Sequence, residues 1–89
     1  MIRQNITIIN KLGLHARAAS KLVNCASRFE SDVFISRSGN RVNAKSIMGV
    51  MMLAASRGVE LELEIDGADE QACLDAMVEL INDRFGEAE

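Results

Sequence analysis

Val59-Glu60-Leu61-Glu62-Leu63-Glu64-Ile65 is the stretch of sequence that decides the fold. Apolar and acidic residues alternate strictly along it, which predicts a strand with one packed face and one face in water. Strands buried on a single face are typical of antiparallel sheets that are covered on one side only. The stretch therefore predicts a one-sided antiparallel sheet.

The rest of the chain supplies three further strands and three helices. The expected strands cover residues 2–9, 32–37 and 41–43, and the expected helices cover about 16–29, 47–55 and 69–85. Asp69 is expected to cap the third helix, and Gly86 to end it. Each strand has one apolar face and each helix one apolar stripe, so the predicted fold class is α+β, with helices on one side of the sheet. We expect a single domain over residues 1–89, since this length allows one modest core.

Composition argues against several classes of function. The 89 residues carry a net charge of −3 and three Phe but no Trp or Tyr, and the basic residues form no long run, so nucleic-acid binding is not expected. No segment resembles a membrane span or a signal peptide. Cys25 and Cys73 lack a metal-ligand spacing and are interpreted as buried free thiols, which predicts a cytoplasmic protein without metal or cofactor.

The candidate site is Gly13-Leu14-His15-Ala16-Arg17-Ala18-Ala19-Ser20, which contains the only histidine. His15 precedes the first turn of a predicted helix, where the backbone N–H groups of Ala16, Arg17 and Ala18 have no helical partner and can bind an anion. The guanidinium of Arg17 can hold an oxyanion with two parallel hydrogen bonds. The pattern predicts a histidine that takes up a phosphoryl group; the alternative is a surface histidine near a helix start.

A second candidate region lies at the predicted second helix. Ser46 is expected to be its N-cap, and a phosphate on Ser46 would face free N–H groups, so the residue is either a regulatory phosphorylation site or a cap alone. The expected inward positions are Val50, Leu53 and Ala54. That arrangement leaves three large apolar residues outside the inward face, Ile47, Met48 and Met51. They are expected either to form an exposed patch suited to a partner or to be covered by helix packing.

Two motifs carry a resemblance to a known family. Gly13-Leu14-His15-Ala16-Arg17 and Asn43-Ala44-Lys45-Ser46-Ile47-Met48-Gly49-Val50-Met51 resemble the HPr family of phosphocarriers of the bacterial sugar phosphotransferase system. The likeness covers nearly the whole chain. It implies an open-faced β-sandwich, a four-stranded antiparallel sheet with three helices packed on one face. The implied sheet order is first, fourth, second and third strand.

The resemblance also implies a function. Phosphoenolpyruvate would phosphorylate enzyme I, enzyme I would phosphorylate His15 on its δ nitrogen, and His15 would pass the group to an enzyme IIA domain, with Arg17 stabilising the phosphate. The regulatory serine of the family matches Ser46, which HPr kinase/phosphorylase phosphorylates with ATP in organisms that have this enzyme. We then expect a monomeric carrier, not an enzyme, without membrane contact, and we expect enzyme I to dock over the helix start and the patch of Ile47, Met48 and Met51.

One position departs from the family pattern, and two alternatives remain. The family usually reads His-x-Arg-Pro, whereas this chain has Ala18, which restores an N–H donor near the predicted phosphate site. Within the same fold, the alternative is a nitrogen-related phosphocarrier paralogue that relays phosphate to regulatory targets. The alternative from another class is a regulatory binding module of the ferredoxin-like type, without covalent chemistry.

Overall fold

The sheet consists of β1 (Ile2–Thr7), β2 (Asp32–Arg37), β3 (Asn40–Asn43) and β4 (Glu60–Asp66). In the computed structural model, which describes residues 1–89, all neighbouring strands are antiparallel and the order is β1-β4-β2-β3. The order that the resemblance implied is therefore confirmed. β4 lies in the interior of the sheet, between β1 and β2.

The alternation in β4 determines which face of the sheet is packed. Leu61, Leu63 and Ile65 are at most 1% exposed, while the glutamates between them lie on the opposite face. The register continues the apolar face into both neighbours, because Leu61 lies opposite Ile6 and Ile65 opposite Val33. One face of the sheet is therefore apolar across its central strands.

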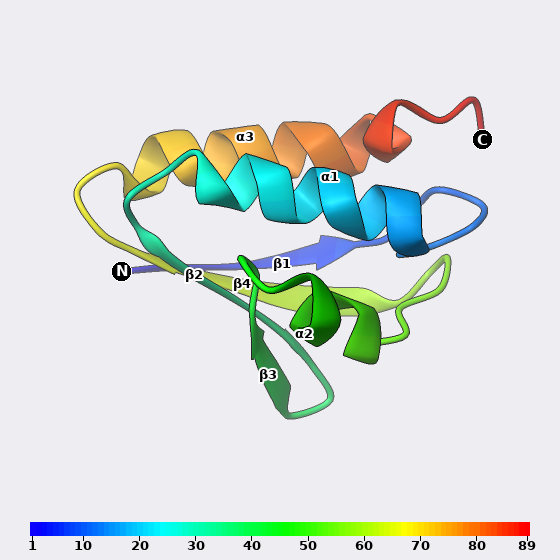
Figure 1. Cartoon of the computed structure of the whole chain (residues 1–89), viewed down its shortest axis with the longest axis horizontal. Helices are drawn as coiled ribbons and strands as arrows, with labels where there is room; N and C mark the ends of the chain where they lie inside the picture. The colour runs from blue at the N-terminus through cyan, green and yellow to red at the C-terminus, as the bar shows by residue number, and fades with distance from the viewer.

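Three helices cover that apolar face: α1 (Ala16–Ser27), α2 (Ile47–Met52) and α3 (Glu70–Asn82). Figure 1 shows α1 and α3 side by side along the sheet and the short α2 near β3. A single cluster of 21 buried residues joins all three helices to the strands. The predicted open-faced arrangement is confirmed. No helix combines the length and the apolar character needed to cross a membrane.

The second helix is shorter than predicted. It ends at Met52, and Ala54 has a left-handed backbone with φ of +49° and an exposed side chain, so its predicted inward position is wrong. Arg37 binds the chain at this bend, because its Nη1 donates to the carbonyls of Leu53 (2.9 Å) and Ala54 (2.8 Å). The buried Val50 and Leu53 agree with the prediction.

The third helix differs from the prediction at both ends. Asp69 holds the N-cap position, but its carboxylate makes no cap bond and instead accepts from the N–H groups of Glu30 and Ser31, each at 2.9 Å. The helix stops at Asn82, before Phe85. The next turn, Arg84–Gly86, has positive φ at all three residues, which turns the chain back and buries Phe85 in the core.

Candidate functional site

The loop between β1 and α1 places His15 at the N-cap of α1. Gly13 has φ of +68°, and a Cβ there would lie 2.6 Å from the carbonyl oxygen of Ala55, so only glycine fits without displacing backbone. Two hydrogen bonds fix the loop: the N–H of Leu14 donates to Ala55 O (2.8 Å), and Nδ2 of Asn10 donates to Gly13 O (2.8 Å). The loop is therefore held between the core and the segment after α2.

The first turn of α1 presents three unpaired backbone donors beside His15. The first helical hydrogen bond runs from the N–H of Ala19 to His15 O (2.8 Å), and the N–H groups of Ala16, Arg17 and Ala18 have no acceptor. The His15 ring makes no cap bond to them. These donors and the positive end of the helix dipole remain available to an anion, as the sequence predicts.

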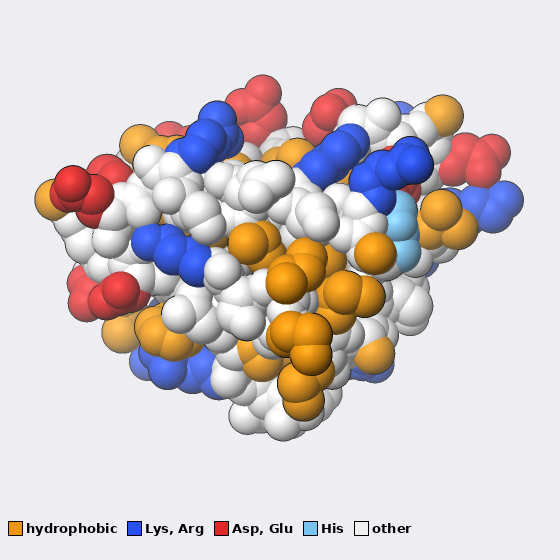
Figure 2. All heavy atoms as spheres, in the orientation of Figure 1, with side chains coloured by type: hydrophobic (Ala, Val, Ile, Leu, Met, Phe, Trp, Pro, Cys, Tyr) orange, Lys and Arg blue, Asp and Glu red, His pale blue; other side chains and the backbone are white.

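Arg17 supplies a positive charge without a partner. Its side chain is exposed and makes no hydrogen bond or ion pair, so no carboxylate competes for the guanidinium. Figure 2 shows Lys and Arg side chains beside the pale-blue histidine. Ala18, by contrast, buries its side chain completely, so only its backbone N–H can contribute to the site.

Glu87 is a member of the site that sequence reasoning missed. Its carboxylate Oε2 is hydrogen-bonded to Nε2 of His15, and its Oε1 accepts from Nδ2 of Asn10 at 2.9 Å. The hydrogen bond from Asn10 and then that from His15 lower the pKa of Glu87 below its ordinary value, so the group is ionised at neutral pH. Nδ1 of His15 has no hydrogen-bond partner and stays open.

The segment that carries Glu87 is fixed at several points. Phe85 is buried, and Nζ of Lys21 on α1 donates to its carbonyl oxygen at 2.6 Å. Further along, the N–H of Lys11 donates to Glu89 O (3.0 Å), and Lys11 Nζ pairs with the Glu89 carboxylate (3.2 Å). Figure 1 shows this segment at the same end of the molecule as the β1–α1 loop. The only sequence signal for it is Gly86, which indicates that the helix stops but not where the chain then goes.

The second predicted region lies on the surface of α2. Ser46 is the N-cap, as predicted, because its Oγ accepts from the N–H of Gly49 at 3.2 Å. Of the two alternatives for the patch, the structure has the exposed one, at 38% for Ile47, 72% for Met48 and 44% for Met51. Met52 is also exposed, because α2 ends there. Figure 2 shows orange hydrophobic side chains over α2 that continue toward the histidine.

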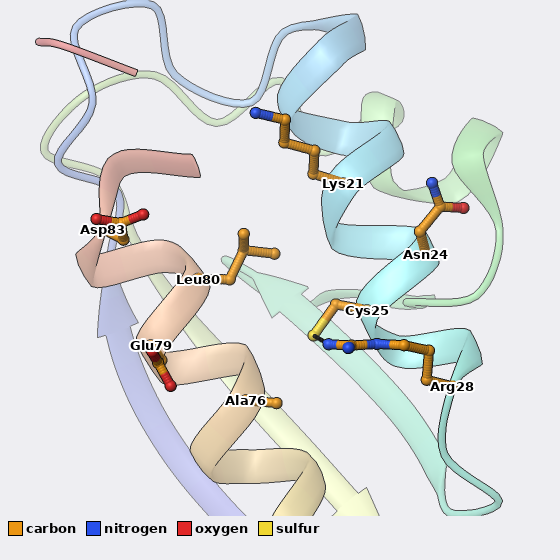
Figure 3. Close-up of a pocket in the computed structure, with 8 residues that line it drawn as sticks. All are labelled: Lys21, Asn24, Cys25, Arg28, Ala76, Glu79, Leu80 and Asp83. Carbon is orange, nitrogen blue, oxygen red and sulfur yellow. Dashed lines mark hydrogen bonds between the residues drawn. The ribbon is translucent and has the colours of Figure 1, made fainter. Parts of the chain in front are cut away.

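A separate pocket of about 540 Å³ lies between α1 and α3 and does not include His15. Figure 3 shows Lys21 and Arg28 on the α1 side of this pocket and Glu79 and Asp83 on the α3 side. Arg28 also donates to Sγ of Cys25 at 3.4 Å. The His15 side chain lies instead on open surface and is 30% exposed, so a partner can reach it directly.

Comparison with known proteins identifies relatives of this chain. Residues 2–83 match the family described as "PTS HPr component phosphorylation site". Phosphocarrier protein HPr of Cupriavidus necator is 58% identical over 89 residues, and that of Neisseria meningitidis serogroup A is 56% identical over 89 residues; each match covers 100% of both chains. A crystal structure of HPr-C-His from Thermoanaerobacter tengcongensis superposes with a TM-score of 0.96 at 44% identity, covering 100% of both chains.

Proposed function

The chain belongs to the HPr family of phosphocarrier proteins, and we propose that His15 accepts a phosphoryl group from enzyme I and passes it to an enzyme IIA domain. The observation that carries the proposal is the position of His15. A partly exposed imidazole lies at the N-cap of α1, next to three backbone donors and an arginine that have no partner. These groups suit a phosphoryl group that must be both bound and released.

The proposed transfer uses the open ring nitrogen. The lone pair of Nδ1 attacks phosphorus, the bond from phosphorus to the donor breaks, and the oxygens gain hydrogen bonds from the start of α1 and from Arg17. Arg17, with its two parallel donors, is proposed to stabilise the phosphoryl oxygens. The nearest carboxylate, Glu87, binds Nε2 and not the attacking nitrogen. In this proposal the chain is a carrier and not an enzyme, because its partners complete the reaction.

We propose that enzyme I docks over the start of α1 together with the patch of Ile47, Met48 and Met51. The patch is apolar and exposed, and it lies on the same face as the histidine (Figure 2). Exposed methionines are adaptable contacts for a partner surface. Met48→Ala should therefore weaken binding of enzyme I and leave the melting temperature unchanged, since that side chain is 72% exposed.

Ser46 is proposed to be the regulatory phosphorylation site, acted on by HPr kinase/phosphorylase in organisms that have it. Ser46 is exposed and adjoins the patch, so a phosphate would add negative charge at the edge of the docking surface. Ser46→Asp should melt no lower than the parent, because an anion at a helix start is favourable by about 0.3–1 kcal/mol. The same variant should bind enzyme I more weakly; equally tight binding would mean that Ser46 is only a cap.

Incubation with enzyme I and phosphoenolpyruvate tests the proposal as a whole. The parent should gain the mass of one phosphoryl group in an acid-labile form, and His15→Ala should fold normally and gain none. Phosphorylation of His15→Ala would refute the assignment, and absence of labelling in the parent would favour the non-covalent binding module. Transfer from the labelled protein to a sugar-specific or a nitrogen-related enzyme IIA distinguishes the two carrier types. We also propose that the carrier is a monomer, formed by the single domain 1–89, and that it acts in the cytoplasm. The two free cysteines support the cytoplasmic location, because thiols stay reduced there.

A further inference from the structure

The contact between Glu87 and His15 determines where the imidazole carries its proton. A neutral imidazole has one N–H and one nitrogen lone pair, and an ionised carboxylate can only accept hydrogen bonds. Because the carboxylate of Glu87 lies at Nε2, that nitrogen must be the donor. The lone pair is then on Nδ1, which has no hydrogen-bond partner. Because His15 is the N-cap residue of α1, this nitrogen is on the residue directly before the first turn of the helix.

We propose that Glu87 is a positioning residue that keeps a proton on Nε2 of His15 while a phosphoryl group arrives at Nδ1 and while it leaves. The inference rests on the proposed function of His15 and adds a residue to it. Glu87 touches neither phosphorus nor its oxygens in this role. It acts through the ring.

The proton on Nε2 matters in both directions of transfer. When Nδ1 forms its bond to phosphorus, the donor leaves with the bonding electron pair, and the ring, which still carries the Nε2 proton, becomes positively charged. The adjacent carboxylate balances this charge. When the Nδ1–phosphorus bond breaks toward an acceptor, the electron pair returns to Nδ1, and the leaving group is a neutral imidazole. Without the Nε2 proton the leaving group would be an imidazolate anion, which is a far poorer one.

Glu87 is held in place without the help of His15. Asn10 donates to its Oε1 at 2.9 Å, and the same Nδ2 donates to Gly13 O at 2.8 Å, which ties Glu87 to the loop that carries the histidine. Phe85, two residues before it, is anchored in the core and bonded to Lys21. A side chain that is bonded to Asn10 and carried on an anchored segment can orient the ring, whereas a free one would only follow it.

Other charged groups lie near Glu87 and His15 and can affect the pH dependence of this pair. Lys21 on α1 contributes to the lowered pKa of Glu87, and Lys11 is paired with Glu89 on the same terminal segment. Arg17 lies on α1, two residues after His15, and Arg57 lies in the loop after α2, where Ala55 O accepts from the N–H of Leu14. Among these groups, only Glu87 bonds to the ring, so it should dominate the retention of the Nε2 proton.

Glu87→Gln tests the proposal with the shape of the site conserved, and Glu89→Gln is the matched control on the same segment. Nitrogen-15 NMR of the ring reports the protonated nitrogen before any phosphorylation. The parent and Glu89→Gln should carry the proton on Nε2, and Glu87→Gln should show a mixture of the two tautomers. Glu87→Asp, which retains the charge, should restore part of the parent spectrum.

The second readout is the pH profile of the phosphorylated protein, prepared with phosphoramidate so that no partner protein is needed. Loss of the phosphoryl group to water requires the Nε2 proton, so the rate falls as the pH rises. This fall should occur at lower pH in Glu87→Gln than in the parent, because the variant lacks the negative charge that favours the protonated ring. Glu89→Gln should behave as the parent.

The outcomes separate this inference from the proposed function. Coincident tautomer spectra and pH profiles for the parent and Glu87→Gln would overturn the role of Glu87, even if His15 is phosphorylated. Phosphorylation of the parent by phosphoramidate but not by enzyme I would instead count against the carrier function. The nitrogen-15 spectra of the ring would then still test the positioning role of Glu87. Equal melting temperatures of the parent and Glu87→Gln establish that a change in the pH profile does not come from loss of folding.

Discussion

Arg17→Ala should slow phosphoryl transfer without affecting folding. The guanidinium makes no hydrogen bond or ion pair and lies on the exposed side of α1, so its loss should change the free energy of unfolding by less than about 0.5 kcal/mol. In the transfer step the same group would provide a charge-assisted hydrogen bond to the phosphoryl oxygens, which contributes about 1.5–3 kcal/mol. That loss corresponds to a rate lower by roughly 10- to 150-fold.

Rapid-quench measurement of transfer from phosphorylated enzyme I tests this expectation, with thermal melting on the same samples. Arg3→Ala is the matched control, because Arg3 is also an exposed arginine but lies on β1. Arg17→Lys should fall between the parent and Arg17→Ala, since lysine keeps the charge but not the two parallel donors. An unchanged transfer rate, or a large drop in melting temperature, would refute the assignment of Arg17 to the phosphate site.

Three further predictions concern the scaffold around the site. Gly13→Ala should destabilise the protein by about 2–4 kcal/mol in denaturant unfolding, because the added Cβ meets Ala55 O at 2.6 Å in a left-handed backbone. Gly39→Ala is the control for the cost of the left-handed backbone alone, since a Cβ there meets nothing within 4 Å. Equal losses of stability in the two variants would contradict a role for the contact with Ala55. Ala18→Pro should fold, because the N–H it removes has no partner, and should change the lifetime of the phosphohistidine; identical hydrolysis rates would exclude a role for that donor. Hydrogen bonds from Ser31 and Glu30 lower the pKa of Asp69 below its ordinary value of 3.8, so the carboxylate is protonated in the unfolded chain before it is protonated in the folded one as the pH falls. The stability that these bonds contribute is therefore present above about pH 4 and is lost below it. Between about pH 5 and pH 3 the melting temperature of Asp69→Asn should drop less than that of the parent.

The two-layer fold could be predicted because local periodicity already determines which face of each element is buried. The alternation in β4 fixes a single packed face wherever the strand lies in the sheet, and the apolar spacing in α1 does the same for a helix. His15 and Arg17 could be predicted for a similar reason. The unpaired donors at a helix start belong to the first turn itself, so a histidine directly before that turn is near them in any tertiary context.

The ends of α2 and α3 could not be predicted in this way. The residues around Ala54 and Phe85 continue an apolar pattern, which favours further helix. The chain instead adopts left-handed backbone at both places, because Arg37 binds the bend at Ala54 and because the core accepts Phe85 only after a reversal. Such strain is tolerated only where tertiary contacts compensate for it, and single-sequence periodicity contains no information about those contacts.

The sequence by itself determined the class of fold and the position of the candidate phosphoryl acceptor, since both follow from neighbours within a turn or two of chain. The exposure of the α2 patch, which the sequence left open, came from the tertiary structure. Only the tertiary structure decided the second half of the site. Glu87 reaches His15 across 72 positions of sequence, and it does so because Phe85 is buried and Lys21 and Asn10 hold the returning segment. The physical reason is that a hydrogen bond between distant segments depends on where the core places both of them, and neither residue carries a local signal of the other.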